Sequence, residues 1–221
     1  PIPLLEAPYK LLSGLLQHRL LLAIRKAGTL PPNTFAFGYR TSLDAPIWWR
    51  AALLNHARHT GSPLILMDFD ASSAFNAPPH DVILAGWEAI NAPTNILALL
   101  RVMLKSMTFR VITDLGLTPT RTVARGAVQG DVLAPLHWLL TYAAVQWHLR
   151  SAFADVTATS GAHARIHLAV YADDTAAYLR DPASAEHSAN LIVEALNRIG
   201  VKVNPNKTII QALNCPGLGL H

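Results

Sequence analysis

Residues 166–179 read IHLAVYADDTAAYL, in which two apolar runs flank Tyr171-Ala172-Asp173-Asp174. Short apolar runs separated by a few polar residues predict two strands, Ile166–Val170 and Thr175–Leu179, joined by a tight turn. The turn then holds two adjacent carboxylates at the end of a buried strand pair. Carboxylates crowded in this way raise each other's pKa, so such clusters usually hold divalent cations or share a proton.

A second pair of carboxylates follows another short buried strand, Leu64–Met67, which runs into Asp68-Phe69-Asp70. The spacing of two puts both carboxylates on one face of the strand. If the strands are neighbours in a sheet, Asp70 converges with Asp173 and Asp174. Such hard oxygen ligands suit Mg²⁺ or Mn²⁺, and two ions about 3.5–4 Å apart are the usual clamp for in-line phosphoryl transfer. An isolated Asp more often caps a turn or a helix, and Asp68 fits that interpretation.

The rest of the chain alternates helical and extended patterns without a strict strand-helix-strand rhythm. This predicts an α+β fold with a sheet that carries helices on one face. Helices are expected over Tyr9–Lys26, Asp44–His59 with a cap near Ser42, Asp81–Ile90, Thr94–Ser106, Asp131–Arg150 and Ala183–Ile199. A hairpin of Phe109–Thr113 with Thr120–Val123 around Gly116, and a last strand Val201–Val203, complete the prediction.

Composition excludes several classes of protein. With 51% hydrophobic and 14% charged residues among 221, the chain can bury a core and is not disordered. The apolar runs Leu11–Ile24 and Val132–Trp147 are interrupted by polar residues or proline, so no membrane span is expected. A single cysteine, Cys215, excludes a disulfide framework and fits an intracellular location, nuclear or cytoplasmic. A net charge of +4 permits a nucleic-acid partner without indicating one strongly.

Four segments, in order along the chain, carry a family resemblance. Tyr171-Ala172-Asp173-Asp174 resembles the tyrosine-x-Asp-Asp box of reverse transcriptases, and three further segments resemble other motifs of that family: Asp70–Asn76 with His80, Arg125–Pro135, and Gly200–Thr208. The start of the chain, Pro1–Lys10 with Arg19 and Leu20, resembles the fingers segment of the non-LTR retrotransposon (LINE-like) branch. Because four motifs stand in the family's order, we identify the chain by resemblance as a domain of that type.

The resemblance implies a right-hand polymerase palm, with a small antiparallel sheet backed by helices, and part of the fingers. Residues 1–40 are then a partial fingers segment, and residues 41–214 the palm with a fingers insertion near 91–125. No thumb is expected within the chain. Because the chain starts at Pro1 without a methionine, we expect it to be cut from a longer polyprotein.

The resemblance also implies the roles of the acidic site. Asp70 and Asp173 would ligate two Mg²⁺ ions, for which Mn²⁺ can substitute, and Asp174 would ligate or only orient. The backbone carbonyl of Ala71 would complete the ion on the triphosphate side. Lys207 is the candidate acid for the leaving pyrophosphate, and its alternative interpretation is an ordinary solvated lysine.

A second group of residues is expected around the incoming nucleotide. The backbone N–H groups of Ser73 and Ala74 would face the phosphates. Phe75 would lie against the sugar and clash with a 2′-hydroxyl, which predicts a preference for deoxynucleotides; its alternative is an ordinary core phenylalanine. Gln129 and Gly130 would contact the nucleotide or the templating base, unless the segment is only a glycine-rich helix entry.

Several residues in and near these motifs differ from those that the family usually has. Glycine at 126, as at 130, lets backbone approach closely. Val128 and Val132 stand where the family has proline, which predicts a looser loop before the helix at Asp131. Asparagine at 76 replaces an aspartate and serine at 73 a lysine, but no departure removes a metal ligand.

The function implied is RNA-templated DNA synthesis, with an RNA template, a DNA primer and dNTPs as partners. Two alternatives stay open: a decayed copy that only binds nucleic acid, and an RNA-dependent RNA polymerase, against which Phe75 argues. The pairs His56 with His59 and His163 with His167 lack a third ligand, so no zinc site is expected. A basic track for the template, or a scatter of surface charges, is formed by Arg101, Lys105, Arg110, Arg121 and Arg125.

Overall fold

A computed structural model of the chain describes residues 5–31, 34–36, 42, 44–128, 130–159 and 167–216. The chain forms two compact units. We call Leu30–Ser72 with Val145–His221 the sheet unit, and Pro1–Thr29 with Ser73–Ala144 the helical unit. The long helix α5, Ala134–Thr159, contributes residues to both.

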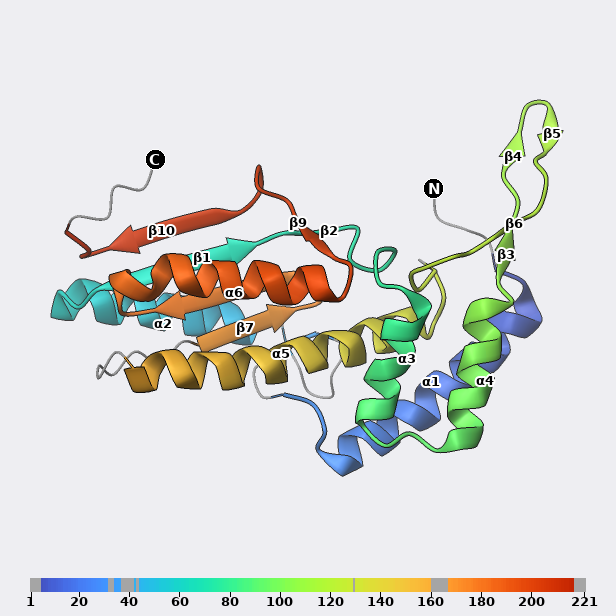
Figure 1. The fold of residues 1–221 in the computed structure, drawn as a ribbon, viewed down its shortest axis with the longest axis horizontal. Helices are drawn as coiled ribbons and strands as arrows, with labels where there is room; N and C mark the ends of the chain where they lie inside the picture. Colours follow the sequence, from blue (N-terminus) through green and yellow to red (C-terminus); the bar gives the residue numbers. More distant parts are fainter. Residues whose placement is uncertain are drawn as a thin grey trace. The chain divides into compact units, whose positions relative to one another are not determined.

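A four-stranded antiparallel sheet forms the centre of the sheet unit (Figure 1). Its strand order is β10-β1-β8-β7, with β1 at Leu64–Phe69, β7 at His167–Tyr171, β8 at Asp174–Leu179 and β10 at Ile209–Leu213. The first four residues of β1 are all buried, because this continuous apolar run lies in the middle of the sheet. The predicted strands at Leu64–Met67 and Thr175–Leu179 are confirmed, whereas Ile166 lies outside the described residues.

Helices cover both faces of this sheet, and the prediction of one covered face is wrong. Helix α2, Asp44–Thr60, contacts β1 and β7. Its apolar side chains pack on a cluster that contains Leu66 and Tyr178. The alternate residues Ile65 and Ala177 are equally buried, each with 0% of its surface exposed. Figure 1 shows α6, Ala185–Arg198, in front of the strands and α2 behind them.

The segments after α6 also differ from the sequence prediction. Strand β9, Lys202–Val203, pairs with β2, Ala71–Ser72, beside the main sheet. The chain then returns as β10, so Val201–Val203 is not the last strand. Strand β10 was missed because its exposed residues do not alternate in polarity, although it is an edge strand whose neighbour β1 supplies the pairing. The predicted helix Ala183–Ile199 is a 3₁₀ turn, Pro182–Ser184, followed by α6.

The helical unit packs α3, His80–Ala89, closely against α5. A Cβ on Gly86 would lie 3.0 Å from backbone atoms of Leu140 and Thr141, so the two helix backbones approach directly there. Helices α1, Ala7–Ala27, and α4, Thr94–Lys105, complete the unit and confirm the predicted helices. Asp131 does not start α5: its carboxylate accepts a hydrogen bond from the Leu133 amide, and the helix begins at Ala134.

The predicted hairpin around Gly116 is present as two short ladders. Strand β3, Thr108–Phe109, pairs with β6, Arg121–Thr122, and β4, Ile112–Thr113, pairs with β5, Gly116–Leu117. All four strands are exposed to solvent.

The boundaries between the two units fall near residues 29, 72 and 144, and the boundaries predicted for fingers and palm fall at residues 40, 91 and 125. The assignment of particular segments to fingers and palm therefore stays a prediction. No helix in the described part of the chain is long and apolar enough to cross a membrane.

Candidate active site

Strand register brings the predicted carboxylates to one end of the main sheet. Phe69 on β1 pairs with Thr175 on β8. Because these strands are antiparallel, Asp70, just after β1, comes level with Asp174 at the start of β8. Tyr171 pairs with Asp174, so Ala172 and Asp173 form the turn of the β7-β8 hairpin. The adjacency expected of the two acidic strands is confirmed.

The hairpin turn needs an unusual backbone conformation. Ala172 has φ 54°, in the left-handed region that non-glycine residues rarely adopt. Two-residue hairpin turns require such values because their twist then matches that of the strands. The sharp reversal leaves Asp173 and Asp174 next to each other beside the end of β1.

The charges of this cluster shift the pKa of Asp174. Partial burial, then the charges of Asp173, Asp70 and Asp68, raise the pKa of Asp174, and Lys207 lowers it. Keeping all these carboxylates ionised therefore costs free energy that a cation in their midst would offset.

Lys207 lies beside the acidic cluster. Its Nζ is 3.5 Å from Asp70 Oδ1, and its side chain is 66% exposed. A turn holds it there: the Asn204 amide donates to the Asp70 carbonyl at 2.9 Å, and the Lys207 amide donates to the Asn204 carbonyl at 3.2 Å. An ion pair as exposed as this one contributes at most about 1 kcal/mol to stability. The Lys207 side chain can therefore reorient.

The same turn decides where the carbonyl of Ala71 points. Ala71 pairs with Val203, and the neighbouring Asp70 carbonyl accepts the amide hydrogen of Asn204. Hydrogen-bonded and non-hydrogen-bonded pairs alternate along an antiparallel ladder. Because Asp70 and Asn204 form a hydrogen-bonded pair, the next pair, Ala71 and Val203, is not hydrogen-bonded. The Ala71 carbonyl therefore points away from β9.

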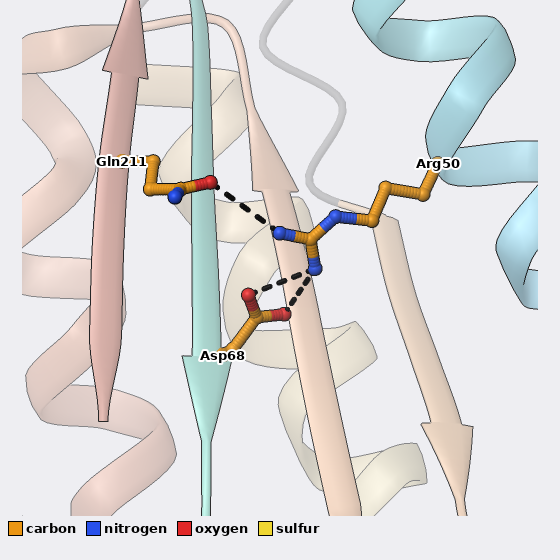
Figure 2. A network of polar contacts seen from close by, with 3 residues as sticks. All are labelled: Arg50, Asp68 and Gln211. Atoms are coloured by element: carbon orange, nitrogen blue, oxygen red, sulfur yellow. Dashed lines mark hydrogen bonds and ion pairs between the residues drawn. The ribbon is translucent and has the colours of Figure 1, made fainter. Parts of the chain in front are cut away.

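Asp68 has a cation of its own (Figure 2). Arg50 on α2 donates from Nη1 to both carboxylate oxygens of Asp68, at 2.7 and 2.8 Å, and from Nη2 to Gln211 Oε1 at 3.4 Å. The hydrogen bond to Asp68 raises the pKa of Arg50. The carboxylate of Asp68 thus forms an ion pair with a residue of helix α2, and the interpretation of Asp68 as a cap of a turn or helix is wrong. Arg50 was missed because nothing in sequence links two residues on separate elements.

The side chains of the cluster are of the kind that a hard divalent cation prefers, since carboxylates that repel one another are stabilised by a cation among them. Among the described residues, no three Asp, Glu, His or Cys side chains are already arranged to hold a metal ion. His163 lies outside those residues.

The predicted nucleotide-contacting residues belong mainly to the helical unit. The Ser73 carbonyl accepts the amides of Asn76 and Ala77, each at 2.9 Å, which closes a tight turn at Ser73, with φ 54°. Ala74 is buried and Gly130 is exposed, whereas Gln129 lies outside the described residues. Phe75 is half-buried, with its ring centroid 5.8 Å from that of Trp138. It is therefore neither a fully buried core residue nor a free surface side chain.

A second segment lies directly against this turn. The Gly126 amide donates to the Pro78 carbonyl at 2.8 Å, and the Ala127 amide donates to the Phe75 carbonyl at 2.7 Å. A Cβ on Gly126 would lie 2.5 Å from the Cα of Asn76. The close approach of backbone expected at residue 126 is confirmed.

Comparison with known proteins decides the family. The model of the family described as reverse transcriptase (RNA-dependent DNA polymerase) matches residues 1–221. The chain belongs to that family. No curated relative matches the sequence.

Solved telomerase structures share the fold of this reverse transcriptase chain. Telomerase from Candida albicans, in complex with a fragment of telomeric RNA, has a TM-score of 0.64 and 14% identity, covering 93% of this chain and 34% of that one. Apo telomerase from Candida tropicalis, truncated from its C-terminal domain, has a TM-score of 0.66 and 14% identity, covering 95% and 42%. The expected α+β polymerase fold is confirmed, and the chain spans less than half the length of either telomerase chain.

Proposed function

We propose that the protein carries out RNA-templated DNA synthesis, adding a nucleotide from a dNTP to the 3′-hydroxyl of a DNA primer. The observation that carries the proposal is the strand register that sets Asp70 level with Asp174 and leaves Asp173 in the adjoining turn. In a reverse transcriptase chain, such a cluster is suited to two-metal nucleotidyl transfer.

Two Mg²⁺ ions, when bound, would activate the primer hydroxyl and neutralise the leaving pyrophosphate, and Mn²⁺ can substitute for them. Asp70 and Asp173 would hold them, with Asp174 ligating or orienting. The carbonyl of Ala71, which points away from β9, supports its part in this set.

Lys207 would supply a proton to the departing pyrophosphate. Its exposure and the weak pairing with Asp70 leave the ammonium group free to turn toward an anion at the acidic cluster. A lysine is suited to this step because it offers both positive charge and a transferable proton.

The turn that contains Phe75 would form the nucleotide side of the site. The amides of Ser73 and Ala74 would face the phosphates, and Gln129 and Gly130 would contact the base pair being formed. Phe75 would exclude a 2′-hydroxyl, and the half-buried position of this residue, with its ring in contact with Trp138, supports that role.

The wider context is also proposed. The resemblance of the first residues to a non-LTR fingers segment supports an origin in a retrotransposon polyprotein, with residues 1–40 as partial fingers and 41–214 as palm. The partners are then an RNA template, a DNA primer and further domains of the same protein, in the nucleus or cytoplasm.

Primer extension tests the proposal. The protein, expressed with its flanking sequence, is given an RNA template, a labelled DNA primer, Mg²⁺ and either dNTPs or rNTPs. We expect extension with dNTPs that stops when the cation is chelated. Equal extension with rNTPs would instead identify an RNA-synthesising polymerase. Template binding without any extension by the folded protein would identify a decayed copy that only binds nucleic acid.

A further inference from the structure

We propose that Trp138 is a specificity-determining positioning residue, whose buried indole sets how far the ring of Phe75 projects toward the sugar of the incoming nucleotide. This inference rests on the proposed function, because it assumes that Phe75 excludes the 2′-hydroxyl. It adds a residue that none of the sequence motifs assigned to the site.

The contact between the two rings is the first observation. Their centroids are 5.8 Å apart with planes tilted by 37°. Trp138 is 2% exposed, whereas Phe75 is only half-buried. The buried indole therefore supports the phenyl ring from the protein interior, and Phe75 as a residue keeps part of its surface exposed.

Trp138 also packs on a second aromatic ring. Tyr142, one turn further along α5, stacks on the indole with centroids 5.2 Å apart and planes 19° from parallel. Tyr142 is also 2% exposed. Protein interiors are close-packed, so an indole that contacts both rings has little freedom to move away from Phe75.

The helix that carries these rings is fixed in place as well. The backbone of α5 at Leu140 and Thr141 approaches Gly86 on α3 as closely as a missing side chain allows. On the adjacent residue, Trp87 Nε1 donates to His137 Nδ1 at 2.9 Å inside the core. The aromatic stack on α5 therefore cannot retreat by a shift of the helix.

The backbone of Phe75 is fixed independently. Its carbonyl accepts the amide of Ala127 at 2.7 Å, and the preceding turn is closed by two hydrogen bonds to the Ser73 carbonyl. With the Cα held, the freedom left to Phe75 is the rotation of its side chain. The side chains packed against the ring limit that rotation, and Trp138 is one of them.

Loss of the indole should therefore relax the choice of sugar. A leucine at 138 is smaller and leaves space into which the phenyl ring can turn. A ring that turns away opens room for one oxygen atom, which is all that separates a ribonucleotide from a deoxynucleotide. We expect Trp138→Leu to lower the ratio of kcat/KM for dNTP over rNTP at least tenfold, mainly by improving use of rNTP.

The experiment measures this ratio in single-nucleotide extension on an RNA template. The variants are Trp138→Leu, Trp138→Phe, Phe75→Val and the double variant Trp138→Leu with Phe75→Val. Trp49→Phe is the matched control, because it also alters a packed tryptophan, one that contacts Tyr178 in the sheet unit. We expect Trp138→Phe, which keeps an aromatic ring and guards against a folding failure of the leucine variant, to lower the ratio by a smaller factor.

The outcomes separate the inference from the proposed function. If the wild-type protein extends no primer, the proposed function fails and the inference with it. If Phe75→Val lowers the ratio but neither Trp138 variant does, only the inference is overturned. If Trp138→Leu lowers it, Trp49→Phe does not, and the double variant loses no more than Phe75→Val, the inference is supported, since Trp138 and Phe75 then act through one ring.

Discussion

At the residue scale, His137 gives the stability of the protein a dependence on pH. It is 2% exposed and accepts a hydrogen bond from Trp87 Nε1 at 2.9 Å, so it is neutral in the folded protein. Burial, with a smaller contribution from His80, lowers the pKa of His137 from 6.5 to about 4. The unfolded chain therefore binds a proton that the folded chain refuses as the pH falls through 6.5.

We predict that the free energy of unfolding decreases as the pH falls from about 6.5 to about 4, by about 3 kcal/mol from this residue. Below that range both states are protonated and this contribution levels off. Urea denaturation at a series of pH values measures it. His137→Asn keeps an acceptor for Trp87 but cannot titrate, so it should flatten the profile. An equally steep profile in that variant would contradict the assignment.

The sequence predicted the positions of only some of the charged residues at this end of the sheet. Asp70, Asp173 and Asp174 could be placed together because each lies beside an apolar run, and strand ends meet in a sheet. Arg50 could not be found in the same way, since it reaches Asp68 from a helix whose orientation depends on packing. Trp138 was missed for a related reason: on α5 it has the pattern of any buried helix residue.

At the element scale, the segment around Gly126 decides how the Phe75 turn is held. A Cβ at Gly126 would meet the Cα of Asn76 at 2.5 Å, and its φ of +81° disfavours other residues. We predict that Gly126→Ala destabilises the protein by about 3 kcal/mol or more, because backbone must move. Thermal unfolding measures the change.

Gly14 provides the opposite test with the same substitution. It lies inside α1, and a Cβ added to it would meet no neighbouring atom within 4 Å. Gly14→Ala should therefore raise stability by about 0.5–1 kcal/mol through helix propensity alone. Similar effects of both alanine substitutions would show that the contact with Asn76 does not constrain Gly126.

The pairing of α2 with the sheet makes a further prediction. Arg50 and Asp68 are each 32% exposed and joined by two hydrogen bonds from one nitrogen. We expect Arg50→Met and Asp68→Asn each to cost about 1 kcal/mol, and the double variant to cost less than their sum. Urea denaturation of the four proteins measures the coupling. Arg58→Met, on an exposed position of α2, is the control, and simple additivity of the pair would refute the coupling.

Elements with a strong pattern were predictable, and those that depend on a neighbour were not. Helices α1, α2 and α4 have clear caps or stops, and β1 and β8 are continuous apolar runs. Strand β10 has neither signal and exists because β1 offers a free edge. The sequence likewise did not predict that helices cover the second face of the sheet, because the burial of Ile65 depends on tertiary packing.

At the scale of the whole molecule, the family resemblance extended across both units because its four motifs lie in order along the chain. The acidic cluster and Lys207 belong to the sheet unit, whereas Phe75, Gly126 and Trp138 belong to the helical unit. The proposed function therefore assigns chemistry and sugar selection to separate parts of the chain. Substitutions in one unit should alter the rate of addition, and those in the other should alter the choice of nucleotide.

The most direct test of the central claim is single-turnover extension of an RNA-templated primer by Asp173→Asn and by Asp68→Asn, beside the wild-type protein. Asp173 lies in the hairpin turn and would hold a metal ion, whereas Asp68 is paired with Arg50. We predict that Asp173→Asn slows nucleotide addition by at least a thousandfold, about 4 kcal/mol, and that Asp68→Asn stays within a few-fold of wild type. Equal rates for the two variants, with both proteins folded and bound to template, would contradict the account.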